Sequence, residues 1–151
     1  MIDGPRDYAG FVTRAVAFAI DVALIDLAAA FVAIVVGLGI SAFDVPDTVR
    51  TIAIAVGGLA YLVWTVGYFA TFWSTTGQTP GARVMGIRVV CADESGVPRA
   101  GATIARLVGM VLAAIPLFAG FFLILVDDRR RGLQDLIGKT VVVYVPRRQA
   151  L

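Results

Sequence analysis

The stretch RAVAFAID, from Arg14 to Asp21, opens an apolar run that continues to Ile40 and places a carboxylate inside it. An ionisable side chain at membrane depth costs about 2.5–3.5 kcal/mol even on lenient insertion scales, so it normally has a partner or a function. Arg14 and Asp21 are nearly two helical turns apart and share a helix face. Their separation along the axis is roughly 10.5 Å at 1.5 Å per residue. We therefore expect Asp21 to find a guanidinium on a neighbouring helix, and Arg106 is the candidate at comparable depth.

Composition places the chain among membrane proteins. Of its 151 residues, 59% are hydrophobic and only 16% are charged, and the mean hydropathy is +0.87. So few charges do not coat a soluble domain of this size. The net charge of +2 is spread over the flanks of the apolar runs, which disfavours nucleic-acid binding because that needs one basic face. The lipid bilayer is the first partner that the sequence predicts.

Three apolar segments each supply the ~20 residues that a spanning helix needs. We expect helices over about 12–38, 49–73 and 102–126. None of the three repeats another, so the chain is predicted to form one membrane domain over residues 1–151.

Two strand-like runs, 84–91 and 140–145, predict a small cytoplasmic β element. Basic residues gather in the N-terminus, the second link and the tail, so the positive-inside rule puts all three on the cytoplasmic side of the inner (plasma) membrane. Three full crossings do not satisfy that rule. Pro116 offers a bend. The predicted fold class is therefore an all-α, multi-pass membrane protein with two spanning helices and a third segment that either spans or re-enters as a helix pair broken near Pro116.

The charged residues beyond the first helix suggest further pairs. Asp135 follows three consecutive arginines and gains nothing from an anionic lipid surface. We expect it to pair with Arg14 or Arg83. The remaining candidate charge partners are Arg88, Arg106 and Asp127.

Two interpretations of Asp21 stay open. In the first, a buried acid–base pair is a structural lock that fixes which helix faces meet. In the second, Asp21 belongs to an ion or proton relay. Asp26, on another face of the same helix, is either a second buried carboxylate or part of a contact with another subunit.

The second apolar segment carries small residues at a spacing of three to four. They are Ala53, Gly57, Ala60 and Gly67. Small side chains let helix backbones approach closely in lipid, so this face predicts helix packing, within the chain or between chains.

Catalytic signatures are missing from the sequence. There is no histidine, one cysteine, no phosphate-binding glycine loop and no nucleophile elbow. We expect no catalytic residue, no metal site and no cofactor, and hence no enzyme.

Three motifs, in order, resemble those of the RDD family of small integral membrane proteins, which is named for one arginine and two aspartates. The motifs are RAVAFAID at 14–21, GQTPGARVMGIRVV at 77–90 and DDRRRGLQDLIGKT at 127–140. The resemblance covers about residues 9–145. It implies that Arg14, Asp21 and Asp135 are the three eponymous residues, a polar triad of the membrane domain.

The resemblance implies transport of ligands not yet identified, and some members of the family are linked to sodium/proton antiport. The chain departs from the family pattern at Ala82, where lysine is usual, and at Gln134, where histidine is usual. A chain with three apolar segments is small for an alternating-access machine. We therefore expect a non-catalytic accessory or structural subunit of a larger membrane transport complex.

The alternative is an oligomeric cation/proton antiporter. In it, Asp21 and Asp135 would exchange protons and cations while Arg14 tunes them. Both functions predict other membrane-protein subunits, or further copies of this chain, as partners.

Overall fold

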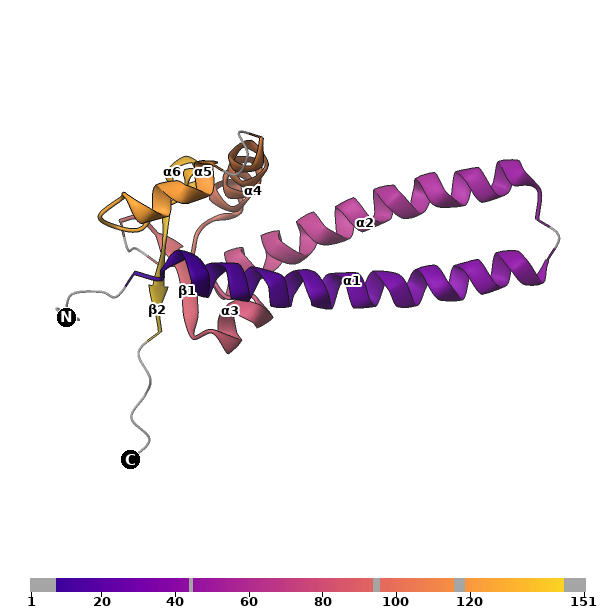
Figure 1. Ribbon diagram of the computed structural model, residues 1–151, viewed down its shortest axis with the longest axis horizontal. Helices are drawn as coiled ribbons and strands as arrows, with labels where there is room; N and C mark the ends of the chain where they lie inside the picture. Colours follow the sequence, from indigo (N-terminus) through magenta and orange to yellow (C-terminus); the bar gives the residue numbers. More distant parts are fainter. Residues whose placement is uncertain (1–7, 44, 94–95, 116–118, 146–151) are drawn as a thin grey trace, which may run out of the picture.

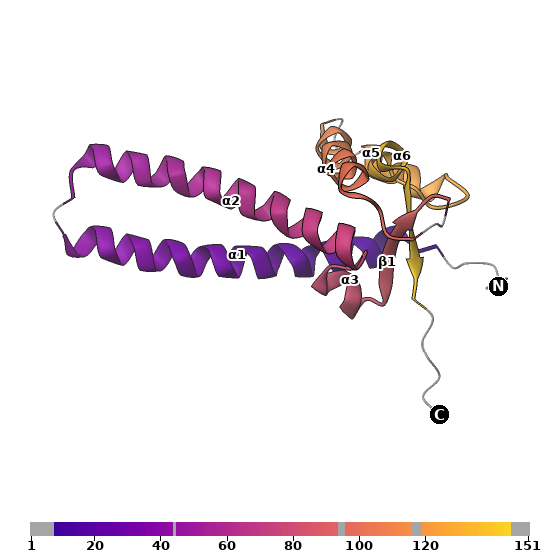
Figure 2. The same ribbon diagram turned by 180° about the vertical axis from the view of Figure 1, so that it is seen from behind.

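A long helical hairpin projects from a small domain that gathers the other described helices and both strands at one end (Figure 1, Figure 2). The computed structural model describes residues 8–43, 45–93, 96–115 and 119–145. Helix α1 (Phe11–Ala42) and helix α2 (Asp47–Thr75) form the hairpin. The first turns of α1 and the last turns of α2 lie within the small domain (Figure 1).

Both hairpin helices are long and apolar enough to cross a membrane. They have 32 and 29 residues, with hydropathy of 2.5 and 1.8 in their most apolar windows. At 1.5 Å per residue they are roughly 44–48 Å long, more than the ~30 Å hydrocarbon core of a bilayer. Their ends lie within four residues of the predicted 12–38 and 49–73.

Burial in the hairpin is confined to its domain end. The buried residues are Ala17, Asp21 and Ile25 on α1 and Phe69 and Trp73 on α2. Every described residue between Ile25 and Phe69 is exposed or half-buried. The free part of α1, 26–42, is about 25 Å long, close to the thickness of the hydrocarbon core. The apolar side chains that it exposes therefore suit contact with acyl chains.

A two-stranded antiparallel sheet anchors the small domain. Strand β1 (Ile87–Cys91) pairs with β2 (Thr140–Tyr144), and Val89 lies opposite Val142. The Ala9 amide donates to the Val142 carbonyl at 2.9 Å, so the chain start runs along β2. The sheet therefore joins the first described residues to the last.

The first strand begins later than the sequence predicted. Residues 84–86 were expected to be extended, but Val84 ends a short helix, α3 (Pro80–Val84). Gly86 then has a φ of 65°, a left-handed conformation that glycine adopts without strain. Pro80 follows Thr79, whose hydroxyl accepts from the Ala82 amide at 3.1 Å, and this N-cap explains the helix.

The third apolar segment is not one long helix. Helix α4 (Ala100–Ala114) is about 22 Å long at 1.5 Å per residue, short of the ~30 Å core. The 3₁₀ helix η1 (Leu123–Leu125) directly follows α5 (Ala119–Phe122). A straight helix over 102–126 is therefore corrected to one 15-residue helix and two short ones. Pro116, where we placed the break, lies outside the described residues.

Helix α4 turns its apolar residues outward. The exposed residues are Ile104, Val108, Val111, Leu112 and Ile115. The opposite face buries Thr103, Arg106, Gly109 and Ala113, and α4 packs most extensively against helix α6 (Leu133–Gly138). A surface helix of a soluble protein has the reverse pattern, so the outward face of α4 suits a nonpolar surrounding.

Gly109 and Gly101 on α4 provide a matched test of this packing. A Cβ at Gly109 would lie 2.7 Å from the Gln134 Cα, whereas one at Gly101 would meet nothing within 4 Å. Overpacking of this kind costs about 1–3 kcal/mol. We expect Gly109→Ala to lower the free energy of unfolding in detergent by that amount, and Gly101→Ala to leave it unchanged or slightly raised, as measured by circular dichroism. Equal stability of the two variants would contradict this packing.

Candidate functional site

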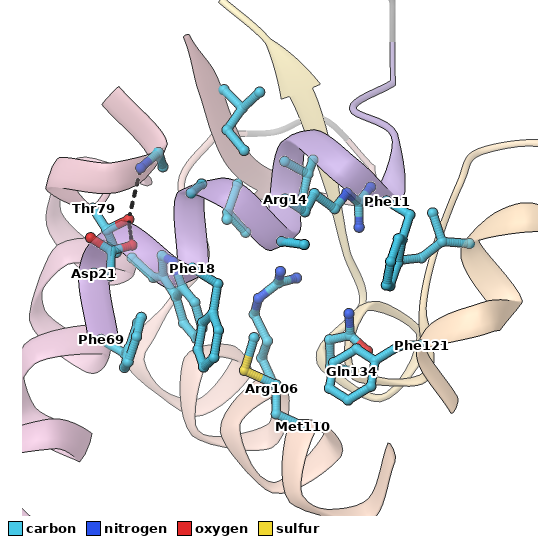
Figure 3. Close-up of a pocket in the computed structure, with 18 of the residues that line it drawn as sticks. Phe11, Arg14, Phe18, Asp21, Phe69, Thr79, Arg106, Met110, Phe121 and Gln134 are labelled. Atoms are coloured by element: carbon cyan, nitrogen blue, oxygen red, sulfur yellow. Dashed lines mark hydrogen bonds between the residues drawn. The ribbon is translucent and has the colours of Figure 1, made fainter. Parts of the chain in front are cut away.

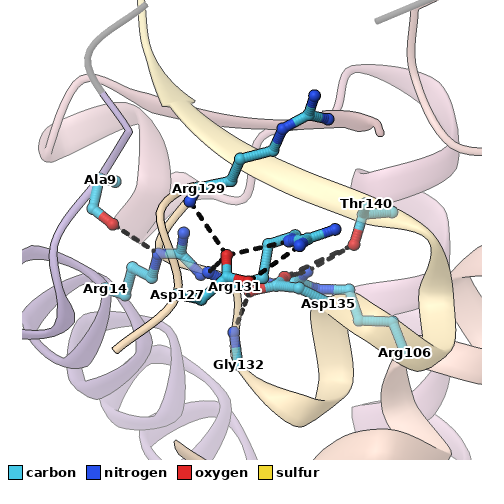
Figure 4. A network of polar contacts seen from close by, with 9 residues as sticks. All are labelled: Ala9, Arg14, Arg106, Asp127, Arg129, Arg131, Gly132, Asp135 and Thr140. Carbon is cyan, nitrogen blue, oxygen red and sulfur yellow. Dashed lines mark hydrogen bonds and ion pairs between the residues drawn. The ribbon is translucent and has the colours of Figure 1, made fainter. Parts of the chain in front are cut away.

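Asp135 is the centre of a buried ionic cluster. It lies in the first turn of α6, where its Oδ2 accepts from the Gly132 amide at 3.0 Å. The Arg14 Nη1 donates to Oδ2 at 2.5 Å, and the Arg106 Nη1 forms a close ion pair with Oδ1 (Figure 4). The Asp135 side chain is fully buried. One carboxylate thus joins the N-terminal helix, α4 and α6.

Each arginine is held by a further contact. The Arg14 Nε donates to the Ala9 carbonyl at 2.9 Å, beside the edge of β2. The Arg106 Nη1 also donates to the Thr140 hydroxyl at 2.9 Å, at the start of β2 (Figure 4). The Arg106 guanidinium lies 4.8 Å from the centre of the Trp73 ring, a cation–π distance. The cluster therefore connects α1, α2, α4, α6 and β2.

Electrostatics keep Asp135 ionised. Burial raises the pKa of this carboxyl, but the charges of Arg106 and Arg14 and the Gly132 hydrogen bond act in the opposite sense. The net result is a pKa below the ordinary value of 3.8. Two cations and one anion leave the cluster with a formal charge of +1.

Asp21 has a different set of partners. Its carboxylate accepts from the Tyr68 hydroxyl at 2.8 Å, the Thr79 hydroxyl at 2.5 Å and the Gly81 amide at 2.8 Å. All three donors are neutral, and they come from the C-terminal half of α2 and from the start of α3. Asp21 is 2% exposed. It therefore fastens α3 to the hairpin.

The expected arginine partner of Asp21 is corrected. Among the described residues, no arginine lies within ion-pair distance of Asp21, and Arg106 binds Asp135 instead (Figure 4). The physical reason is that three short hydrogen bonds already satisfy this buried carboxylate. The triad is thus divided between two sites, with Arg14 and Asp135 in contact and Asp21 bonded elsewhere.

Gly81 makes this second site possible. A Cβ at this position would lie 2.1 Å from the Ala17 carbonyl oxygen and 2.9 Å from the Asp21 Cγ. Only glycine lets the backbone of α3 approach α1 closely enough for the amide to reach the carboxylate.

The other candidate charges lie outside both sites. Arg83 and Arg88 are exposed. Asp127 pairs with Arg131 at 2.8 Å, and the hydrogen bonds from Arg131 lower the pKa of Asp127 to about 2. Asp26 is exposed and accepts from the Tyr61 hydroxyl at 2.7 Å.

Sequence reasoning missed Tyr68 and Thr79 as partners of Asp21. A signal existed for each. Tyr61 and Tyr68 are seven residues apart on α2 and so share a face, and they bond to the two aspartates of α1. Thr79 before Pro80 is a typical N-cap sequence.

The small-residue face of α2 makes little contact with the other described residues. A Cβ placed at Gly57 or Gly67 would meet nothing within 4 Å. Ala60 is exposed and Ala53 is half-buried. This surface is free for contact with lipid or another protein.

The RDD family model matches residues 8–139, which includes both hairpin helices and both carboxylate sites. The chain belongs to the RDD family. RDD proteins are small membrane proteins, in agreement with the two apolar helices. The sequence resemblance is therefore confirmed.

Curated relatives come from Mycobacterium tuberculosis. In two strains of that organism a protein called "Proline-rich antigen homolog" is 38% identical to this RDD chain over 93 residues. The match covers 61% of the chain but only 37% of the relative's length. No solved structure matches the chain.

Removal of the Asp135 charge tests the ionic cluster. Asp135→Asn leaves two buried guanidinium groups without an anion, and breaking a buried pair costs about 3–5 kcal/mol. Asp127→Asn is the matched control, because its partly exposed pair with Arg131 contributes about 0–1 kcal/mol. The free energy of unfolding in detergent should be clearly lower for Asp135→Asn than for Asp127→Asn. Similar losses of unfolding free energy in the two variants would show that the small domain does not depend on the Asp135 ion pairs.

The pH dependence of the same comparison has a defined sign. Because the pKa of Asp135 is lowered on folding, its stabilisation is complete above pH 3.8 and is lost as the pH falls further. The difference in unfolding free energy between the parent and Asp135→Asn should be constant from about pH 8 to 5 and shrink below 3.8. A difference that changes near neutral pH would contradict the cluster described here.

Proposed function

We propose that this RDD protein is a non-catalytic accessory subunit of a larger membrane transport complex. In this arrangement the hairpin spans the plasma membrane and the small domain lies at its cytoplasmic face, together with the N-terminus. The observation that carries the proposal is the saturation of both buried carboxylates by donors of the chain itself. Such sites stabilise the tertiary structure, and the exposed helix faces are then the surfaces that contact a partner.

Saturation weighs against a proton or cation relay. A relay group has to release and rebind its cargo, and a proton carrier works best with a pKa near the operating pH. Asp135 is ion-paired to two arginines, and its pKa is lowered away from neutrality. Asp21 already accepts three hydrogen bonds. Both carboxylates fit the structural lock better than the antiporter.

The hairpin supplies surface for a partner. The small-residue face of α2, made of Ala53, Gly57, Ala60 and Gly67, lies on the part of the hairpin that extends beyond the small domain. Helix association in lipid depends on close backbone approach at such positions. A transmembrane helix of the transporter is the partner that fits this face.

The outward stripe of α4 supports the same placement. Its exposed apolar residues continue into Phe122, Leu125 and Val126. A helix of this length that exposes an apolar face suits an interfacial or re-entrant position beside the hairpin. The small domain would then rest against the headgroups, with its ionic cluster shielded from lipid.

Purification from native membranes tests the accessory role. The full chain, isolated in a mild detergent, should bring a membrane transporter with it in fixed stoichiometry. Gly57→Leu together with Gly67→Leu should release that transporter, because two leucines prevent close approach of the helix backbones.

Ala55→Leu is the matched control. Ala55 is exposed on the opposite side of α2, so this variant should retain the transporter. A chain that purifies alone as a monodisperse particle would refute the proposal, as would equal retention in both variants.

A further inference from the structure

A cavity of about 470 Å³ lies where the hairpin enters the small domain. Its wall is mostly apolar and includes Phe11, Phe18, Phe69 and Met110 (Figure 3). Arg14, Arg106 and Gln134 also line it. In Figure 3 the Arg106 guanidinium lies near the centre of the view, with Asp21 on one side and Gln134 on the other. Cavities of this size with a few placed polar groups are typical of small-molecule sites.

Three of the side chains that line this cavity each carry a buried polar atom without a hydrogen-bond partner among the described residues. These atoms are the Arg14 Nη2, the Arg106 Nε and the Gln134 Oε1. The Arg106 and Gln134 residues are 4% and 3% exposed, and the Arg14 side chain is 10% exposed. Buried polar groups are nearly always paired, so three unpaired atoms on side chains that line one cavity call for a partner.

Water bound at these atoms would leave the apolar part of the cavity unfilled. A buried water needs two to four polar contacts, and apolar cavities stay dry. Most of this wall is apolar, with phenylalanine rings and the Met110 side chain facing the space. A ligand with a polar head and a hydrocarbon body matches both parts of the wall.

The three atoms define the chemistry of the head. Two of them are N–H donors on guanidinium groups and need an acceptor. The third, the Gln134 carbonyl oxygen, needs a donor. The ionic cluster carries a formal charge of +1 (Arg14, Arg106 and Asp135), which favours an anion. A singly protonated phosphate monoester has acceptor oxygens, one hydroxyl donor and one negative charge, whereas a carboxylate lacks the donor.

We propose that this cavity binds a lipid phosphate, a phosphate monoester on a single hydrocarbon chain. Its phosphate accepts from the Arg14 Nη2 and the Arg106 Nε and donates its hydroxyl to the Gln134 Oε1. The chain lies along the apolar wall. Phe18 and Val111 line the cavity and are 44% and 66% exposed. They give the cavity an apolar rim, through which a lipid enters from the bilayer.

Trp73 supplies a built-in probe. The chain has two tryptophans; Trp73 is buried and lines the cavity, and Trp64 is exposed on α2. In a Trp64→Phe background, the full chain in phosphatidylcholine nanodiscs reports on the cavity alone. Lysophosphatidic acid with a dibrominated acyl chain is the ligand probe, because bromine quenches tryptophan on contact. The monoacylglycerol with the same brominated chain lacks only the phosphate.

We expect the lysophosphatidic acid to quench Trp73 at about tenfold lower concentration than the monoacylglycerol, the factor that one charge-assisted hydrogen bond provides. Glycerol 3-phosphate, the head without the chain, should not displace it. Equal quenching by the two brominated probes would overturn the proposal. Full displacement by glycerol 3-phosphate would show a free-phosphate site and would overturn it too.

Three variants locate the site. Ala114→Phe puts a ring into the cavity and should abolish the specific quenching, whereas Val108→Phe on the exposed side of α4 should preserve it. Gln134→Leu keeps the side-chain size but removes the acceptor, and it should raise the required concentration of lysophosphatidic acid about fivefold to tenfold. If Gln134→Leu and the parent respond identically, the proposal fails, even where Ala114→Phe does not fold. The isolated chain is used throughout, so the result is independent of the accessory role.

Discussion

The small domain depends on the burial of one carboxylate between two guanidinium groups. Asp135 has no exposed surface, so its charge is tolerated only because Arg14 and Arg106 lie against it. Three separate helices supply these groups, and Thr140 and Ala9 fix the arginines to the sheet. Removal of Asp135 leaves both guanidinium groups buried without compensation. The arrangement therefore specifies a single way for the helices to meet.

A second junction, in which all the donors are neutral, is added to the first. Asp21 draws its donors from a tyrosine, a threonine and a backbone amide, and these hold α3 against the hairpin. Residues of both junctions, Arg14 and Arg106 from the first and Asp21 from the second, line one mostly apolar cavity. The polar groups of the two junctions therefore determine the form of the cavity as well as the packing around it. The three polar atoms left unpaired point to a ligand, whereas the carboxylates themselves are occupied.

Much of the fold followed from local sequence patterns. The two hairpin helices were predictable because each exceeds the length of a bilayer crossing, and Val-rich runs marked both strands. For the third segment two forms were left open, and the structure does not show the spanning one, because hydropathy alone does not distinguish a spanning helix from a short helix with one buried face. Arg106 and Gly109 within that segment, placed on a common side, were the available sign of burial against protein. The delayed start of β1 followed from the capping of α3 by Thr79.

The candidate site was only half predictable. Arg14 was one of two arginines expected at Asp135, and it is the one in contact. The partners of Asp21 were missed because a charged partner was expected, whereas hydroxyl groups and an amide already satisfy a buried carboxylate. No local pattern shows that position 81 has to be glycine. That requirement comes from the close approach of α3 to α1, which lies some 60 residues earlier in the chain. Contacts of this kind depend on the tertiary arrangement.

The contact between Arg14 and Asp135 joins positions 121 residues apart. On a ribosome that adds about 5–20 residues per second, the first helix therefore exists for roughly 6–24 s before its anion is made. Throughout that interval Arg14 has no buried counterion and remains at the aqueous boundary, as the long side chain of an arginine permits. Closure of the domain is therefore a late event in biogenesis, and a chain truncated before α6 would carry two basic groups that its own residues cannot neutralise.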